Sequence, residues 1–156
     1  MKNMILKTVS VMMVAMIATP LIAYADNPKE NYNTIMEVAQ DEGLDESCTT
    51  FLVATAHQES RGKNIKDESN SPGAGHGIFN LTTQNGDVDD LMNVQKATLI
   101  LVDKINDRGE DCKDMKKAYK NIQKSLLPLE DKSIDFAEEK VDRFLNDRNS
   151  NESQVN

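Results

Sequence analysis

The sequence contains no tryptophan, and all aromatic residues together make up only 4% of the chain. Flat rings are common platforms for apolar ligands and for the faces of sugars, so a site built on several stacked rings is excluded. Basic residues are also scarce, 18 against 26 acidic ones, and the formal net charge is −8. This balance argues against nucleic acid or an anionic membrane surface as a partner, because both attract positive patches.

Cofactor motifs are missing as well. The two histidines, His57 and His76, show no HExxH spacing and lack further well-spaced ligands, so we expect no metal site. Gly73, Gly75 and Gly77 are not accompanied by a strand or by the GK[ST] residues of a phosphate-binding loop. We also find no serine or cysteine nucleophile with a paired base, and we expect no cofactor.

The first residues have the pattern of an export signal. Lys2 and Lys7 precede an apolar run over residues 9–23, and small residues at Ala23 and Ala25 suit a signal peptidase. This predicts a signal peptide over residues 1–25 and a periplasmic or secreted protein. The run is only slightly short of a spanning helix, so a membrane anchor is the alternative.

The two cysteines support the same compartment. Cys48 and Cys112 both follow the leader, and an even cysteine count in an exported chain predicts a disulfide, with two free buried thiols as the alternative. The remaining length suits one domain, which we place at residues 26–147, followed by a disordered polar tail at 148–156. We expect the protein to be a monomer.

Apolar residues recur at helical spacing in most of the chain, which predicts a mainly α fold. A loop region lies between the two halves, from Gly62 to Asp90, where glycine and small polar residues dominate. Only residues 78–81 in this region have the composition of a strand, so we expect a small hairpin at most. The expected helices, with their caps or stops, cover residues 35–42, 45–61, 94–108, 115–126 and 133–145.

One acidic residue stands at a position suited to catalysis. Leu52, Ala56 and Glu59 lie on one helical face, so Glu59 continues an apolar stripe at the end of its helix. Partial desolvation favours the protonated form of a carboxyl group, which is the form that a general acid needs. The alternative is an ordinary helix-end carboxylate paired with Arg61 or Lys63.

The glycine-rich segment after Glu59 completes a known pattern. The residues that carry it are Glu59-Ser60-Arg61, Ser71, Gly73-Ala74 and Gly77-Ile78-Phe79-Asn80-Leu81. They resemble the signature of the lytic transglycosylases in the lysozyme-like superfamily. A weaker similarity continues through Asn93-Val94, Ala97 and Ala118-Tyr119, and the likeness covers residues 33–126. The resemblance implies a lysozyme-like helical domain.

The resemblance also implies roles for individual residues. Glu59 would be the only catalytic acid and base, and it would cleave the bond between muramic acid and glucosamine in peptidoglycan to give a 1,6-anhydro product. Ser71 would contact the substrate near its acetamido group, Asn80 would line the cleft, and Tyr119 would position the acid. Phe79 is the remaining candidate for sugar contact, although it also suits core packing.

The chain departs from the family pattern at two places. Asn80 stands where the family has glutamine, and Lys120-Asn121-Ile122 replaces asparagine, alanine and glycine. A catalytically silent module that binds cell-wall glycan or a protein partner is therefore a second hypothesis. A third is a hydrolytic lysozyme that uses a second carboxylate, for which the candidates are Asp67, Asp87, Asp89 and Asp90. The expected partners are peptidoglycan strands and, as in other small family members, a secretion or conjugation apparatus.

Overall fold

The computed structural model describes residues 27–69, 71 and 73–152, and it is mainly helical, as the sequence predicts. The predicted signal peptide and residues 153–156 lie outside the described residues. The elements in chain order are α1 (Pro28–Asp41), α2 (Glu46–Ser60), β1 (Ile65–Lys66), β2 (His76–Gly77), α3 (Val88–Leu91), α4 (Val94–Arg108), α5 (Met115–Gln123) and α6 (Asp131–Glu152).

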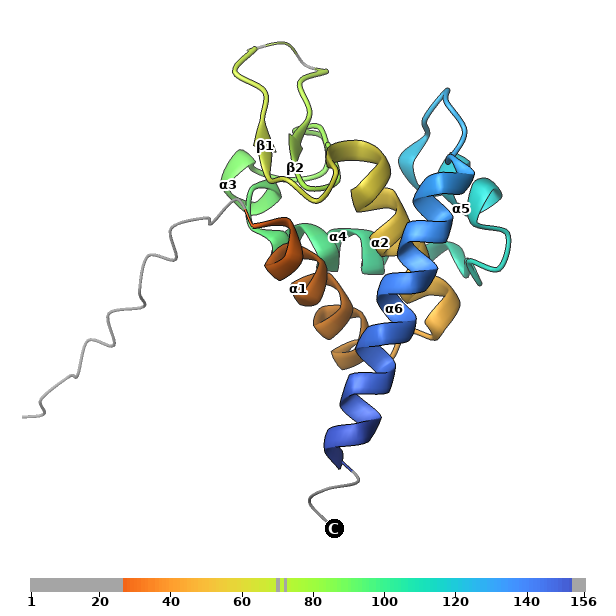
Figure 1. Cartoon of the computed structure of the whole chain (residues 1–156). Coiled ribbons are helices and arrows are strands. Elements are labelled where there is room, and N and C mark those ends of the chain that lie inside the picture. Colours follow the sequence, from red (N-terminus) through yellow and green to blue (C-terminus); the bar gives the residue numbers. More distant parts are fainter. Residues whose placement is uncertain (1–26, 70, 72, 153–156) are drawn as a thin grey trace, which may run out of the picture.

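Helix α2 lies at the centre of the molecule. It contacts α1, α5 and α6, and α1 packs in turn against α4 (Figure 1). Residues 48–56 are buried without interruption, so this helix is covered on all its faces. The element that carries Glu59 is therefore fixed by its neighbours along most of its length.

The helix ends follow the residues that the sequence offers. The Asp45 side chain accepts a hydrogen bond from the Cys48 amide at 2.8 Å and caps α2, as predicted. Gly109 has a left-handed φ of 59° and ends α4, also as predicted. Helix α2 stops just before Gly62, because Arg61 already adopts the left-handed conformation with φ 57°.

The loop region differs from its predicted form. A short antiparallel pair joins β1 to β2, with Ile65 opposite Gly77, whereas residues 78–80 form a turn and only Leu81 makes a bridge, to His76. The predicted strand at residues 78–81 is wrong because Gly77 and Asn80 have left-handed φ values of 73° and 52°. The single-turn helix α3 also lies in this region and is not predicted from the sequence.

Helix α5 is shorter than the apolar spacing predicts. Lys124 is left-handed, with φ 54°, and ends the helix at Gln123. The side chain of Leu126 is consequently fully exposed, at 101% relative accessibility, although the sequence places it in a buried stripe. Leu129 is the leucine of this segment that reaches the core, where it is 1% exposed.

Helix α6 is longer than predicted at both ends. Ser133 is not its cap but a buried residue of its first turn, where the hydroxyl donates to Gln58 Oε1 at 3.0 Å. The predicted disorder of the tail is wrong for residues 148–152, which continue the helix to Glu152. Arg148 donates to the side chain of Gln40 on α1, which holds this end of α6 in place.

Within the described residues, no helix combines the length and apolar character needed to cross a bilayer.

Candidate active site

Glu59 lies in the last turn of α2 and is half-buried, as its position on the apolar stripe predicts. The Tyr119 hydroxyl donates a hydrogen bond to Glu59 Oε1, and the Asn80 side-chain amide donates to Oε2 at 3.3 Å. The three residues come from α2, from the turn after β2 and from α5. Tyr119 is 60 positions from Glu59 in the sequence and Asn80 is 21, so the fold brings three of the five candidate residues together.

The structure does not pair Glu59 with a cation. The ion pairs found among the described residues involve other carboxylates, and neither Arg61 nor Lys63 takes part in one. The interpretation of Glu59 as a helix-end salt bridge is therefore wrong. A half-buried carboxyl group whose partners are neutral donors remains available for proton exchange with a ligand.

A buried serine attaches the end of α2 to the turn that carries Asn80. The Ser60 hydroxyl donates to the carbonyl oxygen of Ile78 at 2.7 Å and also lies 3.0 Å from the carbonyl oxygen of Ala56. Ser60 is only 6% exposed. Ser60 belongs to the Glu59-Ser60-Arg61 motif, but its structural role is visible only in its burial and its hydrogen bonds.

Glycines allow the Asn80 side chain to reach the carboxylate. A Cβ atom on Gly75 would lie 1.7 Å from Asn80 Oδ1, and one on Gly77 would lie 1.9 Å from the carbonyl oxygen of Leu91. Asn80 itself is left-handed, a conformation that asparagine tolerates better than most residues. Gly75 therefore leaves space for the Asn80 side chain.

Tyr119 approaches Glu59 from the core. Its side chain is 2% exposed and packs within the main hydrophobic cluster, so that only the hydroxyl reaches the carboxylate. Burial, followed by the hydrogen bond and the charge of Glu59, raises the pKa of Tyr119 well above its usual value. The phenol therefore keeps its proton and remains a donor at neutral pH.

A second contact connects α5 to the turn that carries Asn80. Gln123 Nε2 donates to the Phe79 carbonyl at 3.2 Å.

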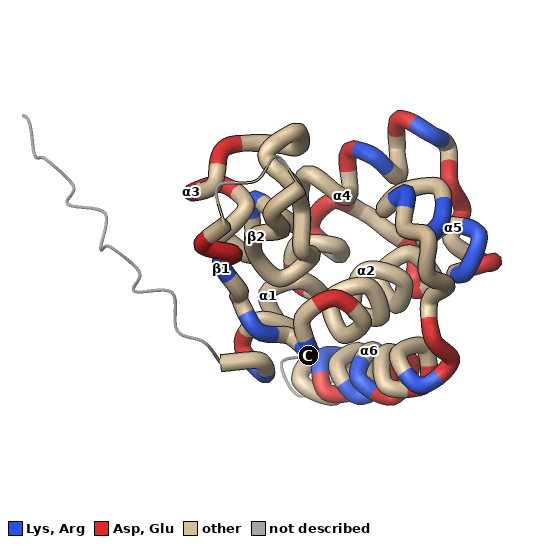
Figure 2. Tube along the Cα trace, turned by 90° about the horizontal axis from the view of Figure 1, so that it is seen from above, with Lys and Arg blue, Asp and Glu red and all other residues tan. Residues whose placement is uncertain are grey.

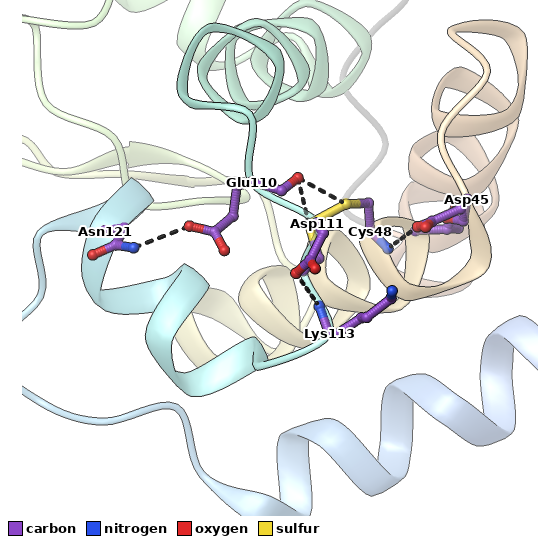
Figure 3. Close-up of a disulfide and its surroundings, with 8 residues drawn as sticks. Asp45, Cys48, Glu110, Asp111, Lys113 and Asn121 are labelled. Atoms are coloured by element: carbon purple, nitrogen blue, oxygen red, sulfur yellow. Dashed lines mark hydrogen bonds between the residues drawn. A yellow bond between two sulfur atoms is a disulfide. The ribbon is translucent and has the colours of Figure 1, made fainter.

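The residues after Tyr119 that depart from the family pattern have structural roles. Asn121 Nδ2 donates to Glu110 Oε2 at 3.0 Å, as Figure 3 shows, and its carbonyl accepts from Arg108. Ile122 is 2% exposed and belongs to the core. These contacts fix α5 against the segment that leads into it, and Tyr119 stays in contact with Glu59.

A disulfide joins the two helices that carry the acid and the tyrosine. Cys48 and Cys112 are bonded, with their Cα atoms 5.0 Å apart, which confirms the predicted pair. Cys48 lies in the first turn of α2, and Cys112 shortly precedes α5 (Figure 3). The bond restrains the two helices at the ends away from the site.

Two candidate residues are not at the site. Phe79 has 0% exposure and is part of the core, so its predicted contact with a sugar is wrong. Ser71 is exposed on the loop between β1 and β2, and its hydroxyl lies 3.2 Å from that of Ser69. It lines a separate pocket of about 750 Å³ together with His76 and Asp89, and Glu59 is not in its wall.

Three of the four aspartates proposed as a second carboxylate, Asp67, Asp89 and Asp90, have contacts or positions away from Glu59. Asp90 forms an ion pair with Lys96 at 2.5 Å, and Asp67 accepts from the Ser69 amide at 2.8 Å. Asp67 and Asp89 line the separate pocket. In the part of the chain that the structure describes, no three histidine, cysteine or acidic side chains are arranged to hold a metal ion.

The arrangement suits proton transfer by one carboxyl group. Tyr119 fixes Oε1 from the buried side, whereas Oε2 has only the longer bond to Asn80, whose side chain is exposed. Oε2 is therefore the oxygen that can exchange a proton with a bound molecule.

Comparison of the chain with family models, with curated proteins and with solved structures finds no match.

Proposed function

We propose that this protein is an exported lytic transglycosylase with a lysozyme-like fold, which cleaves the glycan strands of peptidoglycan. The observation that carries the proposal is the convergence of Tyr119 and Asn80 on the two oxygens of Glu59. These are residues to which the family resemblance assigns the site. Their meeting from distant parts of the chain supports a common task.

In the proposed reaction, protonated Glu59 gives its proton from Oε2 to the glycosidic oxygen between muramic acid and glucosamine. The bond between that oxygen and the anomeric carbon of the muramic sugar breaks. The carboxylate then removes a proton from the 6-hydroxyl of the same muramic sugar. That hydroxyl attacks the anomeric carbon and gives the 1,6-anhydro ring without water. Tyr119 holds Oε1 throughout, so the carboxyl group keeps its orientation while its charge changes.

Export is part of the proposal. The leader-like sequence at residues 1–25 and the Cys48–Cys112 bond both suit an oxidising compartment outside the cytoplasm, where peptidoglycan lies. Local opening of the wall for a secretion or conjugation apparatus would be the corresponding biological role.

Product chemistry tests the activity. Purified protein incubated with peptidoglycan should release 1,6-anhydro-muropeptides, which mass spectrometry distinguishes from reducing-end products by the loss of one water. Glu59→Gln should abolish release, whereas Glu37→Gln, which changes an exposed glutamate on α1, should not. Thermal unfolding of both variants checks that the fold is retained.

The other two hypotheses give different results in the same assay. Reducing-end products would show a hydrolase, which needs a second group to activate water. A wild-type protein that binds peptidoglycan but releases nothing, like Glu59→Gln, would show a binding module. Either result rejects the transglycosylase assignment.

A further inference from the structure

Four cations gather where the C-terminal ends of α4 and α5 meet. They are Lys104 and Arg108 on α4, Lys120 on α5, and Lys124 at the end of α5, and we call them the basic patch. Arg108 Nη1 donates to the Asn121 carbonyl at 2.7 Å, which joins the two helices. Burial, followed by the charges of Arg108 and Lys124, lowers the pKa of the Lys104 ammonium, so these groups are close enough to repel one another.

The four side chains of the basic patch belong to none of the ion pairs found among the described residues, although the chain has 26 acidic residues and Asp103 and Asp107 lie on the same helix as Lys104. Favourable interaction with the helix dipole explains Arg108, Lys120 and Lys124, which lie in the last turns or at the C-terminal ends of α4 and α5. It does not explain Lys104, which lies a full turn before Arg108. Figure 2 shows blue segments along α5, with blue and red segments alternating on α6.

Two segments of the chain connect the basic patch with the candidate active site. Lys120 directly follows Tyr119 on α5, and Lys124 ends the same helix. On the other side, Lys104 Nζ donates to the side chain of Asn85, in the loop that follows the Asn80 turn. A strand held at Glu59 would therefore have its substituents near these cations.

We infer that the basic patch binds the carboxylates of the peptide stems that hang from the glycan strand. The inference rests on the proposed function, because it assumes that peptidoglycan is the substrate. A protein with a net charge of −8 repels an anionic polymer at long range, but salt screens that repulsion beyond about 10 Å. Clustered cations beside the acid provide attraction at short range, where the stems lie.

Binding without turnover tests the inference. In a Glu59→Gln background, Lys104, Lys120 and Lys124 are changed together to glutamine, and Arg108 is kept because it joins α4 to α5. Sedimentation measures binding to peptidoglycan freed of attached phosphate polymers and to the same glycan after an amidase has removed the stems. We expect about tenfold weaker binding to the stem-bearing material, since each exposed charge contact contributes modestly, and a clearly smaller loss on the stem-free glycan, which keeps only the lactyl carboxylate that the amidase leaves on each muramic sugar.

A matched control has the same change of charge elsewhere. Lys29, Lys66 and Lys140 changed to glutamine should bind the stem-bearing material like the parent, and thermal unfolding shows whether either triple variant is damaged. Equal losses on stem-bearing and stem-free glycan, or no loss at all, would overturn the inference. Stem-dependent binding by a wild-type protein that forms no 1,6-anhydro product would instead overturn the proposed activity and leave the basic patch as a stem-binding surface.

Discussion

The hydroxyl of Ser60, at the end of α2, donates to the carbonyl oxygen of Ile78, eighteen positions later in the chain. This buried bond connects the residue next to the candidate acid with the turn that presents Asn80. Ser60 has no direct contact with a ligand in this arrangement. Its effect on chemistry would come through the relative position of Glu59 and Asn80.

Ser60→Ala removes the donor and leaves a buried carbonyl without its partner. We expect a loss of about 1–3 kcal/mol in the free energy of unfolding, measured by urea denaturation, together with reduced glycan cleavage. Ser150→Ala, which removes an exposed hydroxyl bonded within α6, should change stability by less than about 0.5 kcal/mol. Similar effects of the two substitutions would contradict the role assigned to Ser60.

Tyr119→Phe removes only the hydroxyl that fixes Glu59 Oε1. We expect kcat on peptidoglycan to fall about tenfold to a hundredfold, as for the loss of a buried hydrogen bond to a charged group, with little change in KM. Tyr32→Phe is the matched control, because Tyr32 is also buried and its hydroxyl bonds to His57 instead. If both variants lose activity equally, the effect is structural and Tyr119 has no special role.

Gly75→Ala inserts a methyl group where Asn80 Oδ1 lies. The Asn80 side chain must move away from Glu59, so we expect cleavage to fall about tenfold to a hundredfold through misplacement of the site. Gly73→Ala is the control, since a Cβ atom on Gly73 meets nothing within 4 Å. Steady-state rates of the two variants decide the matter, and an active Gly75→Ala enzyme would show that Asn80 is dispensable.

Stability should depend on pH through His57. Burial, followed by the charges of Arg61 and Lys132, lowers the pKa of His57 in the folded protein. The unfolded chain then binds more protons than the folded one below about pH 6.5, and the contribution of the neutral ring is lost as the pH falls further. We expect the stability of wild type relative to His57→Asn to decrease between pH 7 and pH 5 in urea titrations. A pH-independent difference would argue against this account.

Removal of the disulfide should weaken both stability and activity. Cys48→Ala with Cys112→Ala is expected to lower the free energy of unfolding by about 4 kcal/mol in the chain-entropy model. Activity should fall as well, because the bond restrains the helices that carry Glu59 and Tyr119. Calorimetry and product release, each with and without a reductant, give the comparison. An unchanged wild-type protein under reductant would show that the bond is unimportant.

The sequence was sufficient for features that depend on nearby residues. The helical class, the cap at Asp45 and the stop at Gly109 follow from side chains within a few positions of the helix ends. Predictions from the local residue pattern are wrong where a left-handed backbone conformation interrupts the expected strand or helix. Residues 78–80 turn because two residues are left-handed, and Leu126 is exposed because Lys124 ends α5 early.

The same distinction between local and long-range features holds for the residues of the candidate site. Sequence alone identified Glu59, Asn80 and Tyr119 as chemical groups of the right kind and predicted the partner of each cysteine. Only the tertiary structure decided that Asn80 and Tyr119 contact Glu59, that Ser71 and Phe79 do not lie with them, and that Ser60 holds the turn in place. The reason is physical: residue type and helical spacing act over a few positions, whereas contacts between distant segments depend on how the whole core packs around α2.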